Sequence, residues 1–270
     1  MTQKKKIIIG NWKMNPTTIN QASDIFKKIQ KDTNNLTKTH IAICPPYIYL
    51  ETLARLSDAF KLKNKTKKTK KTSHLNPILL GAQNLNPEPA GARTGEISGE
   101  LLGQFGVKYV IIGHSERRDL GETDASVNTK ILAALNWKFK VILCVGEKSR
   151  DDDGHYLAFI KNQLEQALVG VKKEDLKSLV VAYEPVWAIG ATEAMTPSSV
   201  HEMMIFIRKT LFDIYKTRTL STSILYGGSV DPTNAGEILQ QGDADGLLIG
   251  RQSLDPAAFV SIVTIANTVS

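Results

Sequence analysis

The chain contains eight short runs of β-branched and aliphatic residues, each ending at a polar or glycine-containing turn. The runs are KIIIGN, HIAICP, ILLGAQN, YVIIGHS, VILCVGE, LVVAYEP, SILYGG and GLLIGR. Segments with helical periodicity lie between them, and the clearest are 18–31, 48–60, 125–137, 157–168, 198–215 and 256–266. Strands that are apolar on both faces indicate a parallel sheet covered by helices.

This alternation predicts an α/β fold, a single (β/α)8 barrel that forms one domain over residues 1–270. Eight strand–helix units of about 34 residues each use the whole chain and leave no sequence for a second domain. An open, doubly wound parallel sheet is the alternative. No GxGxxG dinucleotide-binding turn follows the first run, which favours the barrel.

The net charge of +7 is concentrated in one segment, because the seven lysines between positions 61 and 71 account for all of it. We expect a Lys-rich insertion at about 61–77, a solvated loop between the second helix and the third strand. Helix-to-strand loops lie on the face of a barrel opposite the catalytic groups, so the insertion should not touch substrate. Nucleic acid and membrane are not expected partners, although a secondary polyanion-binding role of the lysines stays an alternative.

The N-terminal segment and the two cysteines indicate a soluble, cytoplasmic protein. The apolar run that follows the first lysines stops at Ile9, so no secretory signal is expected, and no stretch is long enough for a membrane-spanning helix. Cys44 and Cys144 lie in or at the end of strand-like runs. Reduced thiols in the core are the favoured interpretation, and a disulfide is the alternative.

Polar residues at the ends of the eight runs are the candidates for chemistry, because barrel active sites form at the C-terminal ends of the strands. They are Asn11, Lys13, Cys44, Gln83, Asn84, His114, Ser115, Glu116, Glu147, Glu184, Gly227, Gly228, Ser229, Gly250 and Arg251. The glycine turns at the last two ends offer backbone N–H groups to a phosphate. The set suits a small anionic carbonyl compound. Neither a metal nor another cofactor is expected, because no CxxC occurs and the HEMM segment lacks a second histidine.

Four motifs carry a resemblance to a known family. GNWKMN at 10–15, GHSERR at 113–118, AYEPVWAIG at 182–190 and YGGSV at 226–230 closely resemble the triosephosphate isomerase family, from the first strand to the last. The resemblance implies a TIM barrel and an intramolecular oxidoreductase that interconverts dihydroxyacetone phosphate and D-glyceraldehyde 3-phosphate in glycolysis and gluconeogenesis. It also implies a cytoplasmic homodimer that uses no cofactor.

The resemblance implies four catalytic residues. Glu184 is expected to move a proton between adjacent carbons through an enediolate. His114 is expected to act as a neutral electrophile that donates a hydrogen bond to the developing oxyanion. Lys13 is expected to offset the charge of the phosphate and the enediolate, and Asn11 to position the oxygen and the lysine.

Further residues are implied to bind substrate or to support the catalytic groups. Gly190, Ser229 and Gly250 are expected to hold the phosphate mainly through backbone N–H groups. Glu116 is expected to be a partner of Lys13. Cys144 and Tyr226 are expected to have supporting roles.

The sequence departs from the family pattern at three places. Ala191, Thr192 and Glu193 replace the usual Thr-Gly-Lys of the lid, so we expect intact catalysis with altered lid kinetics. Arg251 occupies a position where glycine is common, next to the expected phosphate site. Arg93 precedes Thr94, in the loop through which the family's subunits dock into one another.

Two alternative functions are weighed, one of them another enzyme and the other a binding protein. A phosphate-binding barrel acting on a larger phosphosugar would share the late glycine turns but not the other three motifs. A non-catalytic phosphosugar-binding barrel would have no need of Lys13, His114 and Glu184 together.

Overall fold

A computed structural model of the chain describes residues 4–66, 75–188, 194–217 and 222–269. Within these ranges, parallel strands close into a barrel in which each strand pairs with its neighbours in the sequence and β1 pairs with β8. The strands are β1 (Lys6–Asn11), β2 (Thr39–Cys44), β3 (Leu79–Ala82), β4 (Tyr109–Ile112), β5 (Lys140–Val145), β6 (Leu179–Tyr183), β7 (Ser223–Tyr226) and β8 (Gly246–Ile249).

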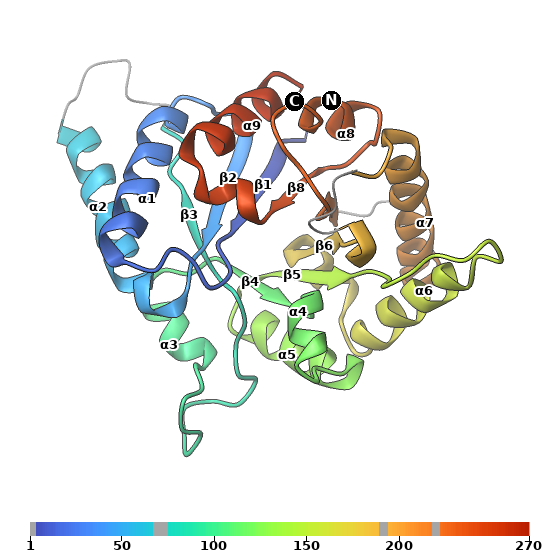
Figure 1. Cartoon of the computed structure of the whole chain (residues 1–270). Helices are drawn as coiled ribbons and strands as arrows, with labels where there is room; N and C mark the ends of the chain where they lie inside the picture. The colour runs from blue at the N-terminus through green and yellow to red at the C-terminus, as the bar shows by residue number, and fades with distance from the viewer. Residues whose placement is uncertain (1–3, 67–74, 189–193, 218–221, 270) are drawn as a thin grey trace.

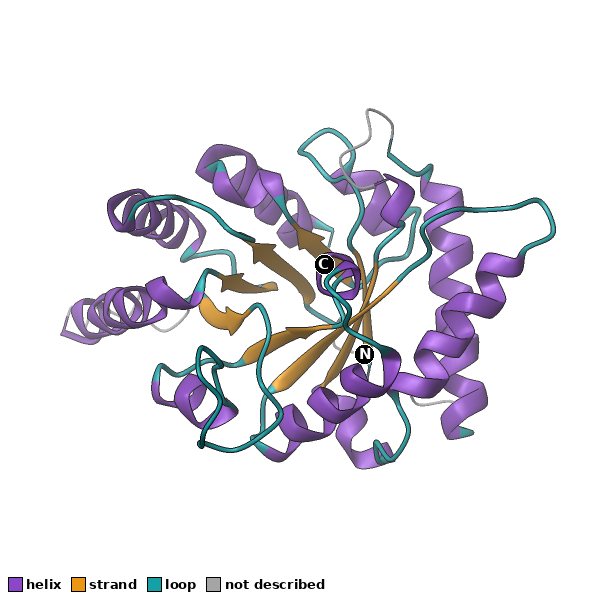
Figure 2. Ribbon diagram, turned by 60° about the horizontal axis from the view of Figure 1, so that its bottom comes forward, coloured by secondary structure: helices purple, strands orange, loops and turns teal. Residues whose placement is uncertain are grey.

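Helices surround the barrel, as the two ribbon views show (Figures 1 and 2). The α-helices are α1 (Ile19–Thr33), α2 (Leu50–Thr66), α3 (Gly99–Gln104), α4 (Ser115–Asp119), α5 (Asp124–Asn136), α6 (His155–Ala167), α7 (Pro197–Tyr215), α8 (Ala235–Gln240) and α9 (Pro256–Thr268). Short 3₁₀ helices are η1 (Tyr47–Tyr49), η2 (Lys173–Ser178), η3 (Val186–Ala188) and η4 (Arg251–Leu254). Side-chain caps begin several helices, for example Thr18 on α1 and Thr123 on α5.

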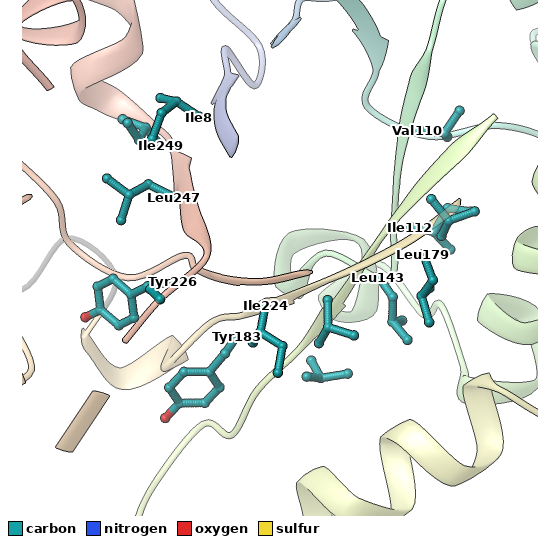
Figure 3. Close-up of a cluster of buried hydrophobic side chains, with 14 of the residues drawn as sticks. Ile8, Val110, Ile112, Leu143, Leu179, Tyr183, Ile224, Tyr226, Leu247 and Ile249 are labelled. Carbon is teal, nitrogen blue, oxygen red and sulfur yellow. The ribbon is translucent and has the colours of Figure 1, made fainter. Parts of the chain in front are cut away.

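The apolar core has two layers because each strand points alternate side chains to opposite faces. The inner cluster consists of strand residues alone, among them Ile9, Ile111 and Leu225, and it fills the barrel. The outer cluster joins the other strand face, including Ile8 and Leu143, to helix residues (Figure 3). Burial on both faces explains why the strands read as continuous apolar runs in the sequence.

All eight predicted strands are present, and the single (β/α)8 barrel is confirmed. The six clearest helices are also present, with ends that differ by a few residues. The exception is the second, because α2 continues to Thr66 instead of ending near Phe60. The start of the Lys-rich insertion is therefore helical and not a loop. Lys and Asn at 61–65 are compatible with a helix, and the solvated-loop interpretation overlooked this. Residues 67–74 lie outside the described part of the chain.

Both cysteines, Cys44 and Cys144, are buried and free, as expected. Burial raises the pKa of both thiols, and the nearby Glu184 carboxylate raises that of Cys144 further. Both sulfurs are therefore neutral and unreactive at physiological pH. Among the described residues, no helix is long and apolar enough to span a membrane.

Candidate active site

A cavity of about 350 Å³ opens at the C-terminal ends of the strands. Nine residues predicted from the sequence line it, namely Asn11, Lys13, His114, Glu184, Gly227, Gly228, Ser229, Gly250 and Arg251. They come from the ends of β1, β4, β6, β7 and β8 or from the turns that follow. Barrel closure brings together groups separated by up to 240 positions, so the cavity depends on the whole fold.

Glu184 is the buried carboxylate of this cavity, with only 3% of its surface exposed. Its backbone N–H donates to the Val145 carbonyl at 2.8 Å, which extends the β5–β6 ladder by one residue. One side-chain oxygen, Oε2, accepts a hydrogen bond from the Ser115 backbone N–H at 3.2 Å. The other, Oε1, lies 3.1 Å from Nε2 of His114. The carboxylate is thus fixed at both oxygens and faces the cavity.

The hydrogen bonds of His114 assign its tautomer. Nδ1 accepts a hydrogen bond from the Glu116 backbone N–H at 3.2 Å, in the first turn of α4. A nitrogen that accepts this bond cannot carry a proton, so the ring is neutral with its proton on Nε2. Nε2 therefore donates to Glu184 in the unliganded site, and it can donate to a substrate oxygen in the cavity.

Lys13 supplies a positive charge beside these two groups. Its Nζ contacts the Glu116 carboxylate at 2.6 Å, so the predicted pairing of Lys13 with Glu116 is present. The backbone of Lys13 has a left-handed φ of 53°, which is uncommon for a residue with a side chain. Two bonds hold it: its N–H donates to Oδ1 of Asn11 at 3.0 Å, and its carbonyl accepts from Nε2 of Gln83 at 2.7 Å.

Gln83 is a positioning residue to which the sequence alone gave no role. Its Nε2 bridges the carbonyls of Lys13 and Cys44, at 2.7 and 2.9 Å, and so ties the ends of the first three strands together. Its place after the third apolar run was the available signal. Nothing in the sequence indicated that its amide would bond to the backbone instead of to a ligand.

Backbone turns after β7 and β8 form the other wall of the cavity. After β7, the Asn234 amide donates to the Ser229 carbonyl at 3.3 Å, and Asp231 accepts from the backbone and hydroxyl of Thr233. These bonds lower the pKa of Asp231, with the Thr233 hydroxyl as the main cause. After β8, the Gly250 carbonyl accepts from the backbone N–H and the hydroxyl of Ser253. These hydrogen bonds fix the backbone conformation of both turns.

Arg251 begins η4 and lines the cavity with an exposed side chain. In the described part of the chain, no carboxylate lies within ion-pair distance of its guanidinium, whereas Lys13 is paired with Glu116. Among the described residues, its positive charge is therefore uncompensated. An anionic ligand group is the natural complement of such a charge.

Two residues predicted to support the site do not line the cavity. Cys144 is a buried neutral thiol on the inner face of β5. Tyr226 is buried on β7, and burial raises its pKa to about 12, so it is a neutral phenol. A Cβ added to Gly228 would lie 2.2 Å from the Tyr226 hydroxyl oxygen, so the ring packs directly under the β7 turn.

A charged cluster joins the end of β5 to the start of the segment after β6. Oε1 of Glu147 accepts from the Tyr183 hydroxyl at 2.8 Å, from Arg150 Nε at 2.9 Å and from Trp187 Nε1 at 2.9 Å. Glu147, a candidate from the strand ends, therefore supports the segment after β6, while Arg150 stands in no motif of the sequence. Gly190 and the altered lid positions Ala191, Thr192 and Glu193 lie outside the described residues.

Comparison with known proteins gives one consistent result. A family model described as triosephosphate isomerase matches residues 6–266. The triosephosphate isomerase of Moorella thermoacetica is 40% identical over 262 residues, covering 96% of this chain and 98% of that protein. That of Gloeothece citriformis is 42% identical over 264 residues, with 96% and 98% coverage. That of Chloroflexus aurantiacus is 40% identical over 261 residues, with 95% and 97% coverage.

Proposed function

Because this chain belongs to the triosephosphate isomerase family, we propose that the cavity at the ends of its strands is where dihydroxyacetone phosphate and D-glyceraldehyde 3-phosphate are interconverted. The enzyme is an isomerase of glycolysis, an intramolecular oxidoreductase that changes a ketose into an aldose. The observation that carries the assignment of the site is the contact between Glu184 and the Nε2 proton of His114 inside a cavity that also contains two cations.

Glu184 acts as the base and then as the acid. Its carboxylate removes a proton from the carbon beside the carbonyl group, and the electrons of the broken C–H bond form the double bond of an enediolate. The proton of the hydroxyl group on the first carbon moves to the former carbonyl oxygen, and the carboxylic acid returns a proton to the neighbouring carbon, so the carbonyl group now lies on the first carbon. A carboxylate suits this shuttle because it can accept and donate within one turnover. The two hydrogen bonds to its oxygens hold it in place.

His114, Lys13 and Asn11 stabilise the charge that develops on the substrate oxygen. The Nε2 proton of His114 becomes available to that oxygen when substrate displaces the contact with Glu184. The ammonium group of Lys13 supplies positive charge, and Glu116 together with Asn11 positions it. A neutral imidazole suits this step, because its N–H group is about as weak an acid as the enediol. An imidazolium is a much stronger acid.

The phosphate group binds at the wall formed by the turns after β7 and β8. Ser229 and Gly250 offer backbone N–H groups there, and Gly190 completes the set proposed from the family pattern. Arg251 adds a guanidinium that the usual glycine at this position would not supply. Phosphate bound at this wall would place the three-carbon chain toward Glu184 and His114, which line the same cavity.

Substitution of Glu184 by Asp tests the assignment of the base. The shorter side chain withdraws the carboxylate by roughly 1 Å, and a displacement of that size costs about a hundredfold in rate. A coupled assay on dihydroxyacetone phosphate should show turnover by the wild type and about a hundredfold lower kcat in Glu184→Asp, with KM little changed. Glu237→Asp, at an exposed position on α8, is the matched control.

Two results would contradict the proposal. Equal turnover by wild type and Glu184→Asp would show that another group moves the proton. If the wild type bound a phosphorylated enediolate analogue but turned over no substrate, the chain would be a non-catalytic phosphosugar-binding barrel.

We also propose a homodimer that docks through the loop around Thr94. Residues 88–96 are exposed throughout, and the segment between β3 and α3 extends away from the rest of the molecule (Figure 1). Arg93 forms two contacts of 2.8 Å with the Glu88 carboxylate, which stiffens this loop. Met14 and Ile48 are large apolar residues that are 89% and 77% exposed. A second copy of the chain would bury such side chains.

Met14→Glu tests the dimer. A charge at the centre of an apolar contact should weaken association by several kcal/mol, because it would be buried without a partner. Analytical ultracentrifugation should show a dimer for the wild type and a monomer for Met14→Glu, while Val169→Glu, at an exposed apolar position elsewhere, should remain dimeric. A wild-type monomer would refute the proposal.

We propose a cytoplasmic location for the enzyme, where glycolysis supplies its substrate.

A further inference from the structure

The N-terminal mouth of the barrel, at the end opposite the active site, is lined with basic side chains. The inner cluster takes alternate residues from β1, β2 and β5, beginning with Ile7, Ala42 and Ile142. Lys5, His40 and Lys140 stand two positions earlier in the same segments. Since alternate residues share a face, these three side chains continue the inward rows at the N-terminal end. The interior of an eight-stranded barrel is narrow, so the rows converge.

Contacts and electrostatic effects support this convergence. Nζ of Lys140 lies 5.6 Å from the centre of the Tyr109 ring, and Tyr109 belongs to the inner cluster. Burial lowers the pKa of His40, and the charges of Lys140 and then Lys5 lower it further. Among the described residues, no carboxylate counteracts these effects on His40. Three groups that can be positive therefore lie near one another at the mouth.

The two lysines on the other face of this segment, Lys4 just before β1 and Lys6 at its start, do have partners. Lys6 donates to the carbonyls of Ala244 and Leu239 at 2.8 and 3.3 Å, and Lys4 donates to the Thr222 carbonyl at 3.3 Å. Within the described ranges, the side chains of Lys5, His40 and Lys140 have neither an ion-pair nor a hydrogen-bond partner. The inward side of the mouth thus carries positive charge without compensation, while its outward side is satisfied.

We propose that this N-terminal mouth binds a small tetrahedral oxyanion, inorganic phosphate or sulfate, between Lys5, His40 and Lys140. Ammonium groups bind such anions as point charges, and a protonated imidazole adds a hydrogen-bond donor. The site is distinct from the substrate cavity, because it lies at the opposite ends of the strands. A small anion is favoured over a polymer because the site consists of three side chains at one end of a barrel whose interior is filled by other side chains.

Nuclear magnetic resonance titration of the histidines tests the proposal on the full chain. Inorganic phosphate should raise the pKa of His40 by about one unit relative to chloride at the same ionic strength, because a bound anion favours the imidazolium. A shift no larger than the one in chloride would overturn the proposal. Glycerol 3-phosphate provides the second arm. If the ester alone shifted His40, a phosphorylated metabolite would be the ligand and a free oxyanion would not.

Lys140→Ala and Lys161→Ala provide the matched pair of variants. Removal of Lys140 should raise the His40 pKa in chloride, since a nearby positive charge is lost, and should abolish the further rise caused by phosphate. Lys161 lies on α6 beside Glu165, and its removal should leave the full response. Retention of the phosphate response in Lys140→Ala would overturn the assignment. Both lysines are exposed, and far-ultraviolet circular dichroism with isomerase turnover would show that each variant is folded.

Discussion

Lys13 combines an unusual backbone conformation with a position in the proposed active site. A left-handed φ of 53° costs a residue with a side chain on the order of 1 kcal/mol, and the bonds from Gln83 and to Asn11 keep it in place. The conformation directs the ammonium group toward Glu116 and the cavity. Gly250 lies against the lysine stem, since a Cβ added there would be 3.5 Å from Lys13 Cε. The strained backbone of Lys13 therefore places its ammonium group beside the cavity, where we propose that negative charge develops on the substrate.

Arg251→Gly tests the role of the uncompensated guanidinium. If the side chain contacts the substrate phosphate, its loss removes a charge-assisted hydrogen bond from ground-state binding. For an exposed group we expect KM to rise about threefold to tenfold with little change in kcat. Steady-state kinetics on both triose phosphates would measure this. Arg251→Lys keeps the charge and should recover part of the loss, while an unchanged KM in Arg251→Gly would show that the side chain points away from the substrate.

The sequence predicted the side chains that line the cavity better than the residues that position them. Glu184, His114 and Lys13 stand in recognisable motifs at strand ends, and all three line one cavity. Arg150 stands in no motif. It becomes visible only when the fold places its guanidinium 2.9 Å from Glu147 and 5.4 Å from the centre of the Trp187 ring. Contacts of this kind depend on side-chain directions that periodicity does not give.

At the scale of elements, the close approach of β5 and β6 decides where Glu184, the proposed catalytic base, lies. Gly146 follows β5, and a Cβ added there would be 1.8 Å from the carbonyl oxygen of Glu184. Only glycine allows the two segments to come this near. The ladder bond from Glu184 N–H to the Val145 carbonyl, at 2.8 Å, depends on the same approach. The turn after β5 is therefore part of the geometry of the base.

Gly146→Ala should damage both stability and catalysis. Relief of the overlap must move the backbone of Glu184, and overpacking of this severity costs about 3 kcal/mol in the free energy of unfolding. A shift of the carboxylate of roughly 1 Å would lower kcat about a hundredfold. Urea denaturation and the coupled assay would measure the two effects. Gly103→Ala, in α3 with no atom within 4 Å of the added Cβ, should be neutral in both. Wild-type behaviour of Gly146→Ala would contradict this account of the turn.

The limits of helices were less predictable than their existence. The amphipathic part of α2 has apolar residues such as Leu50 and Leu53 that pack in the core, and it was recognised from that pattern. Its last turns contain lysine, asparagine and threonine and give no periodic signal, so the sequence pattern does not indicate that the helix continues to Thr66. Polar residues can extend a helix that packing has already nucleated, because each added residue then costs little.

At the scale of the whole molecule, the pH dependence of stability should carry a contribution from His40. Its pKa in the folded state lies below the ordinary value of 6.5, with burial as the main cause, followed by Lys140 and Lys5. As pH falls through 6.5, the unfolded chain gains a proton that the folded chain does not, so the free energy of unfolding decreases until the folded pKa is reached. His40→Gln should lose less stability than the wild type over this interval, as measured by urea denaturation.

An identical pH dependence of the two proteins would refute this prediction. The matched control is His155→Gln, at an exposed position on α6, which should follow the wild type. Phosphate should reduce the acid destabilisation of the wild type but not that of His40→Gln if the anion site proposed at the N-terminal mouth exists.

The closing of the barrel by β1 and β8 also bears on how the enzyme emerges from the ribosome. The indole of Trp12 donates to the carbonyl of Ser253 at 3.1 Å, and the cavity contains both Asn11 and Gly250. A nascent chain that has reached only β7 leaves β1 with an unpaired edge. It also lacks the turn after β8, which forms part of the cavity wall. Activity must therefore appear only after synthesis is nearly complete, and premature termination anywhere before β8 yields an inactive fragment with an edge open to aggregation.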